Sequence, residues 1–207
     1  MGLKDPQKIL FALIAVLGVG FLGYQVLGSR HSDKFSKSLM KAPDFKFEER
    51  SGRVFSSDEL KGKVWVVDFV FTRCAGSCPM LTRQMEILQE AWKGNGDLKL
   101  VSFTVDPDHD TREVMKKYSE DAKADPSQWF FLSGAKKDIY PVIRDGFKVT
   151  AMADPQPEPG FEFIHTTRMI LVDGHGDVRG IYDGQEDGDM KKLWADVRYL
   201  LSSRDHT

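Results

Sequence analysis

Cysteine is scarce in this sequence: residues 74 and 78 are the only two among 207. A single pair excludes a scaffold held by several disulfides, and by itself it excludes a zinc site of four cysteines. The chain also lacks an excess of charge, with 29 basic and 31 acidic residues and a formal net charge of −2. There is no basic stripe with interleaved aromatic residues, so we expect no nucleic-acid partner. The sequence shows no internal repeat and no low-complexity tract.

One long apolar run is present near the N-terminus. Residues 9–27 are 19 consecutive uncharged and mostly apolar residues, enough to span a bilayer and more than the apolar core of most signal peptides. We therefore predict four parts: a short head at 1–8, a transmembrane anchor at 9–27, a tether at 28–41 and a globular domain at 42–203. A cleaved signal peptide is the alternative, because small residues stand near a cleavage point at 26–28.

The orientation of this anchor follows from the lengths on its two sides. Basic residues flank the run at both ends, so the positive-inside rule alone does not decide. A long domain translocates largely regardless of charge, which favours the domain on the outer face, in an oxidising compartment. No Arg- and Ser-rich presequence precedes the run. We expect a single-pass protein of a bacterial inner membrane with its domain in the periplasm, in preference to the mitochondrial intermembrane space.

Apolar runs and amphipathic segments alternate through the rest of the chain. A β-hairpin around 51–52 and a single helical turn at 57–60 come first. The expected strands are 64–71, 98–105, 129–132, 161–165, 168–172 and 178–182, and the expected helices end near residues 92, 124, 144 and 201. This order predicts an α/β layer sandwich around a mixed sheet. The thioredoxin-like fold, with an extra N-terminal β-hairpin, fits it.

The two cysteines lie between an apolar strand and an amphipathic helix. Proline favours the first helical position, so Pro79 places Cys78 at the helix N-terminus and Cys74 in the preceding loop. A helix N-terminus and the nearby Arg73 predict that thiolate formation is eased. Two adjacent thiolates can form a disulfide, exchange one or bind a soft metal ion. A purely structural disulfide would close so short a loop that it would contribute only about 2 kcal/mol.

Other residues could join this chemistry. His165 stands at the end of an expected strand, and two thiolates with one imidazole would suit a monovalent copper ion. Asp68 interrupts an apolar strand just before the cysteines. It could relay protons to the thiols, or it could form a structural hydrogen bond, which is the favoured interpretation. Met80 and Met85 have helical spacing and are expected in the core.

Three aspartates alternate in one polar loop, at positions 106, 108 and 110. They resemble a calcium loop, but Thr111 stands where that loop needs glycine and Lys117 where it needs glutamate. Helix capping and turn formation are the better interpretation. His109, in the same loop, is a weak candidate for an accessory ligand. The remaining histidines are assigned no role: His31, His175 and His206.

Together these motifs resemble the SCO/SenC family of membrane-anchored copper proteins. The resemblance covers about residues 42–201. It depends on a cysteine pair with three residues between, a proline after the second cysteine, a later histidine, a VDP-x-x-DT block and an N-terminal anchor. These features correspond to Cys74, Cys78, Pro79, His165, Val105, Asp106, Pro107, Asp110, Thr111 and residues 9–27.

The resemblance implies a copper ion bound by Cys74, Cys78 and His165. It also implies a metallochaperone that helps to assemble the binuclear copper site of cytochrome c oxidase, with subunit II of the oxidase or another copper chaperone as partner. Some family members act as thiol–disulfide reductases, so a membrane-anchored reductase with a redox-active Cys74/Cys78 disulfide is the alternative, and whether the chain is an enzyme stays open. Thr72 resembles a peroxidase loop residue, but the second cysteine is too close for a typical resolving partner.

Overall fold

The structure is a computed structural model that describes residues 15–16, 18–19, 38–74, 76, 78–149, 152–153, 163–164 and 166–203. The chain divides into two units, Met1–Ser38 and Leu39–Thr207, and the architecture below is that of the second. Within the described ranges, no helix is long and apolar enough to cross a membrane. Of the anchor predicted at 9–27, these ranges include only residues 15, 16, 18 and 19.

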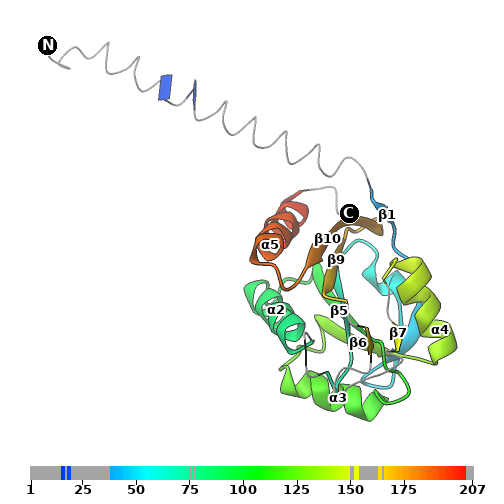
Figure 1. The fold of residues 1–207 in the computed structure, drawn as a ribbon. Coiled ribbons are helices and arrows are strands. Elements are labelled where there is room, and N and C mark those ends of the chain that lie inside the picture. Colours follow the sequence, from blue (N-terminus) through cyan, green and yellow to red (C-terminus); the bar gives the residue numbers. More distant parts are fainter. Residues whose placement is uncertain are drawn as a thin grey trace, which may run out of the picture. The chain divides into compact units, whose positions relative to one another are not determined.

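A mixed sheet of eight strands forms the centre of the described part of the second unit (Figure 1). The strand order is β1-β10-β9-β4-β5-β6-β2-β3. The strands are β1 (Met40–Lys41), β2 (Lys46–Glu49), β3 (Val54–Ser56), β4 (Val64–Val70), β5 (Leu98–Thr104), β6 (Trp129–Ser133), β9 (Arg168–Val172) and β10 (Asp177–Asp183). β4, β5 and β6 are parallel, and the other pairings are antiparallel. A separate ladder pairs β7 (Met152–Ala153) with β8 (Phe163–Ile164).

Helices cover both faces of this sheet. They are η1 (Ser57–Leu60), α2 (Cys78–Ala91), α3 (Arg112–Asp121), α4 (Lys136–Pro141), η2 (Val142–Gly146) and α5 (Asp187–Ser202). In Figure 1, α2 and α5 lie on one side of the sheet and α4 on the other. This arrangement, with the N-terminal hairpin β2–β3 added beside β6, confirms the predicted mixed α/β sheet.

Two strands were not predicted, β7 and β1. Met40 and Lys41, the last residues of the predicted tether, form β1 and pair with Val178 and Asp177 of β10. The polar, aperiodic sequence there gives no sign of a strand, because the pairing depends on an edge that β10 offers from far along the chain. The other predicted strands and helices that fall on described residues are confirmed within a few positions.

One face of β4 and β5 is covered by aromatic rings, which include Phe45 and Phe47 from the N-terminal hairpin region. Phe103 lies at its centre, with ring centroids of Phe45, Phe47, Phe69 and Phe147 at 5.0 to 6.2 Å. All of these rings are buried. This cluster supplies much of the hydrophobic core and carries no polar group.

Candidate functional site

The cysteine pair lies where β4 ends and α2 begins, as predicted. The Cys74 amide donates to the Phe71 carbonyl at 3.2 Å, which closes a tight turn after β4. Cys78 is the first residue of α2, and its amide donates to Cys74 Sγ at 3.4 Å. No disulfide bond joins the two thiols in the structure. The carboxyl end of a central strand thus brings two sulfur atoms together at a helix N-terminus.

The two thiols differ in burial, and this corrects the expectation that Cys78 ionises easily. Cys78 is only 3% exposed, whereas Cys74 is half-buried. Hydrogen bonding to Cys74 and burial raise the pKa of the Cys78 thiol above its ordinary value. The hydrogen bond to Cys74 and the desolvation of the Cys78 thiol both oppose the effect of the helix N-terminus on this residue. The amide of Cys78 is directed at the sulfur of Cys74 and favours negative charge on that atom instead.

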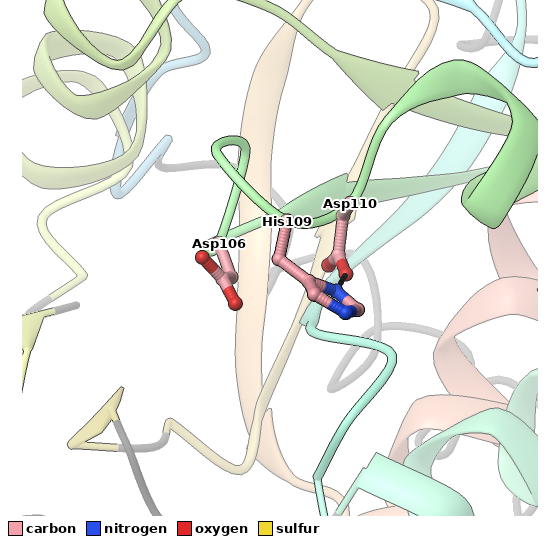
Figure 2. Close-up of side chains that lie close together, drawn as sticks. All are labelled: Asp106, His109 and Asp110. Atoms are coloured by element: carbon pink, nitrogen blue, oxygen red, sulfur yellow. Dashed lines mark hydrogen bonds and ion pairs between the residues drawn. The ribbon is translucent and has the colours of Figure 1, made fainter.

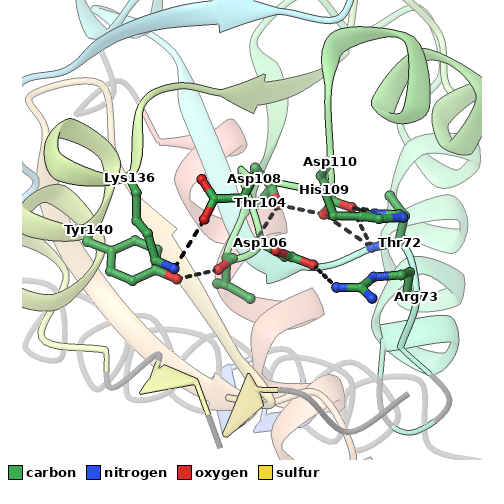
Figure 3. A network of polar contacts seen from close by, with 10 residues as sticks. Thr72, Arg73, Thr104, Asp106, Asp108, His109, Asp110, Lys136 and Tyr140 are labelled. Carbon is green, nitrogen blue, oxygen red and sulfur yellow. Dashed lines mark hydrogen bonds and ion pairs between the residues drawn. The ribbon is translucent and has the colours of Figure 1, made fainter. Parts of the chain in front are cut away.

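Arg73, which was predicted to add a positive charge near the thiols, forms an ion pair with a carboxylate. Its guanidinium donates to Asp106 Oδ2 at 2.6 Å, in a pair that Figure 3 shows. Asp106 is buried, so this carboxylate offsets much of the positive charge that the sequence analysis assigned to the cysteine loop.

The aspartate loop also contacts the cysteine loop. Figure 2 shows Asp106, His109 and Asp110, whose candidate ligand atoms lie within 4.8 Å of one another. However, Asp106 is paired with Arg73, and Asp110 accepts hydrogen bonds from Thr72. A cation at this place would have to displace those donors, so we interpret the cluster as a junction between loops.

The turn and the helix cap predicted for this loop are confirmed, but the cap is Thr111 and not one of the aspartates. The side chain of Thr111 caps α3 by accepting from the amide of Val114, and the Asp110 carboxylate instead faces Thr72, 38 positions away in the sequence. A contact over such a distance has no local pattern in the sequence. The VDP-x-x-DT block was the only available signal in the sequence. It identified Asp110 but did not identify Thr72 as the residue that Asp110 contacts.

Asp68 lies in β4 on the side of the sheet that α2 and α3 cover. It is fully buried, and its Oδ1 accepts from Ser102 Oγ at 2.5 Å, while Trp129 Nε1 donates to the same serine oxygen at 2.9 Å. Its Oδ2 has no hydrogen-bond partner among the described residues. Burial raises the pKa of Asp68 to about 7. The Ser102 contact supports the structural interpretation of this aspartate.

The first turns of α2 contain further residues beside the cysteines. Thr82 and Tyr118 of α3 share a hydrogen bond of 2.6 Å between their hydroxyl groups. Met85 is fully buried, as expected, but Met80 is 38% exposed. The helical spacing correctly identified one core methionine and misassigned the other.

The third predicted ligand, His165, lies outside the described residues, as do His31 and His206. The strand that follows His165 is described. β9 runs antiparallel to β4 with Ile170 opposite Val67, so β9 begins at the end of β4 that leads to the cysteines. Gly184 donates its amide to the Thr167 carbonyl at 2.8 Å. A Cβ at Gly184 would collide with Leu81 of α2, so the start of β9 lies close to the first turn of α2.

Comparisons with known proteins agree with this geometry. A family model described as SCO1/SenC matches residues 34–202. The SCO1 protein homolog of Bacillus subtilis (strain 168) is 33% identical over 156 residues, which cover 74% of this chain and 79% of that protein.

Two solved structures extend the comparison to the fold. BsSco, described with a disulfide switch as a member of the Sco family of cytochrome c oxidase assembly proteins, is 29% identical with a TM-score of 0.70. The match covers 82% of this chain and 99% of BsSco. Bradyrhizobium japonicum ScoI, solved with copper bound, is 23% identical with a TM-score of 0.66, over 78% of this chain and 99% of its own, and shares the fold.

Proposed function

Because this chain belongs to the SCO1/SenC family, we propose that it binds copper through Cys74, Cys78 and His165 and delivers it during assembly of cytochrome c oxidase. The observation that carries the proposal is the pair of sulfur atoms, joined by the contact from the Cys78 amide to Cys74 Sγ. Thiolates are soft ligands and prefer monovalent copper, which a third, imidazole donor would complete. Copper is the cargo of the protein in this proposal.

The path of β9 supports His165 as the third ligand. His165 precedes Thr167 by two residues, and β9 begins beside the end of β4 that leads to Cys74. The close approach of Gly184 to Leu81 holds the start of β9 against the first turn of α2, three residues after Cys78. This position of β9 beside β4 and α2 supports the proposal that a donor just before β9 completes the site.

A membrane anchor would place this site beside its target. We propose that residues 9–27 span a bacterial inner membrane and hold the domain on the periplasmic side. Subunit II of cytochrome c oxidase, or a second copper chaperone, would be the partner there. BsSco is described as a member of the Sco family of cytochrome c oxidase assembly proteins, and Bradyrhizobium japonicum ScoI, which shares the fold, was solved with copper bound.

Copper titration of the reduced full chain, in competition with a cuprous chelator, tests the ligand set. We expect one copper ion per chain with sulfur coordination in X-ray absorption. His165→Ala should weaken the affinity by at least about tenfold, because one of three donors is lost. The matched control is His175→Ala in the β9–β10 turn, which should bind as the wild type does. Equal affinities for the two variants would exclude the ligand role of His165.

A thiol–disulfide reductase is the second candidate, favoured by the unequal burial of the two cysteines. The more exposed Cys74 thiolate would attack a sulfur of a partner disulfide and release the other partner sulfur as a thiolate. Cys78 would then lose its proton and attack Cys74, which oxidises the pair and leaves the partner fully reduced.

Complementation of a deletion strain separates the two candidates. Thiol exchange does not need His165, whereas a copper site of three donors does. His165→Ala at normal protein level and low copper should fail to restore oxidase assembly if the chain delivers copper. Full restoration would favour the reductase.

A further inference from the structure

One carboxylate joins the two loops of the site. Asp110 is fully buried, and its Oδ1 accepts from Thr72 Oγ1 at 2.6 Å, while its Oδ2 accepts from Thr104 Oγ1 at 2.6 Å (Figure 3). The Thr72 amide donates to the same carboxylate at 3.2 Å, and His109 Nδ1 lies 3.1 Å from it. Asp110 therefore connects the end of β5 to the residue that stands two positions before Cys74.

The backbone of the loop that carries Asp110 also forms hydrogen bonds of its own. Backbone hydrogen bonds from the His109 and Asp110 amides to the Asp106 carbonyl, at 3.1 and 2.8 Å, close the turn. Thr111 caps the following helix. Burying a carboxylate is costly unless donors satisfy it, and the donors here come mainly from the ends of β4 and β5. The interaction thus serves the junction with the cysteine loop.

We propose that Asp110 is a positioning residue for the cysteine pair and acts through Thr72. This inference depends on the proposed function only for the identity of the bound metal. Thr72 lies inside the turn that the Cys74 amide closes onto Phe71. Holding Thr72 by both its hydroxyl and its amide fixes the path of that turn, and so keeps Cys74 Sγ opposite the Cys78 amide. The Arg73–Asp106 pair is a weaker support, because its guanidinium is 42% exposed and screened by water.

The consequence is preorganisation of the two sulfur atoms. Binding groups that are already held together lose little conformational freedom when they take up a metal ion or close a disulfide. With the Thr72 contact removed, we expect the turn to sample other paths and the sulfur atoms to meet less often. Copper affinity and the equilibrium constant for closing the disulfide should fall together.

Three variants of the full chain test this inference. Asp110→Asn and Thr72→Val weaken the contact, and Thr72→Val is the milder change because the amide contact is retained. Asp196→Asn is the matched control. Asp196 of α5 is also a buried aspartate, and its carboxylate accepts a hydrogen bond of 2.6 Å from Tyr182 Oη of β10. Thermal unfolding reports the loss of stability in each. Cuprous affinity and the disulfide equilibrium with glutathione report the site.

We expect Asp110→Asn to lower both site constants about tenfold, which for the disulfide is a shift of about 30 mV. Thr72→Val should lower both constants by a smaller factor, because the Thr72 amide still donates to Asp110. Asp196→Asn should stay within about twofold of the wild type at a comparable loss of stability. Site constants that match those of Asp196→Asn would overturn the positioning role. The disulfide constant needs no copper, so it still tests Asp110 if the wild type binds no cuprous ion and the proposed function fails.

Discussion

The two faces of the central strands β4 and β5 carry different kinds of side chain. On one side, Phe69 and Phe103 lie opposite each other in register, within a cluster of aromatic rings. On the other side, the next residue pair in register is Asp68 and Ser102, two buried polar residues among apolar neighbours. Adjacent residues of a strand point to opposite faces, so a shift of one position separates the aromatic cluster from a buried carboxyl and hydroxyl.

This difference indicates that the two faces of the sheet have different roles, one in stability and one in supporting the cysteine pair. The cluster of phenylalanine rings on the aromatic side carries no titratable group and contributes stability through burial. The polar side contains the carboxyl of Asp68 and lies under α2, whose first residue is Cys78. The buried carboxyl of Asp68 and the hydroxyl of Ser102 thus lie on the face that holds the cysteine pair.

The largest expected effect is on the aromatic side. Phe103→Ala removes the ring at the centre of the cluster and should lower the free energy of unfolding by about 3–5 kcal/mol, through lost burial and the cavity that remains. Urea unfolding measures this change. The disulfide equilibrium of the folded chain should stay within about twofold of the wild type. A large change in that equilibrium would show that the two sides are not independent.

The next effect in size concerns pH and the polar side. The ordinary pKa of Asp68 is 3.8, and the folded chain raises it to about 7. Between these values the folded state holds a proton that the unfolded state has lost, so the free energy of unfolding falls as pH rises and levels off above about pH 7. Asp68→Asn should remove this decline, which we expect to amount to about 2–4 kcal/mol.

Urea unfolding at pH 5 and pH 8 checks the prediction for Asp68. The exposed carboxylate of Asp121 provides the control, and Asp121→Asn should keep the pH dependence of the wild type. If Asp68→Asn keeps it as well, then this carboxyl is ionised in the folded protein throughout that range.

The smallest effect concerns the contact between α2 and α3 above the polar side. Thr82→Val removes the hydroxyl contact with Tyr118 and should cost about 1 kcal/mol. Tyr118→Phe should cost a similar amount, and the double variant little more, because both changes delete the same hydrogen bond. Additive losses in urea unfolding would mean that the two hydroxyl groups do not depend on each other.

Local signals in the sequence were sufficient for much of the fold. The apolar runs of β4, β5 and β6 identify strands buried on both faces, and alternation with helices implies their parallel order. Pro79 identified Cys78 as the first residue of its helix. Each inference needed only residues near one another in the chain, because backbone dihedral preferences and periodicity are local properties.

Interactions between distant segments could be decided only by the tertiary structure. β1 exists because β10 offers an edge, and Asp110 faces Thr72 because β4 and β5 end side by side. The sequence placed Cys78 at a helix N-terminus, where charge is favoured, but burial raises its pKa and leaves Cys74 facing the helix amide. Desolvation and pairing depend on which groups the folded chain brings together, and no short stretch of sequence contains that information.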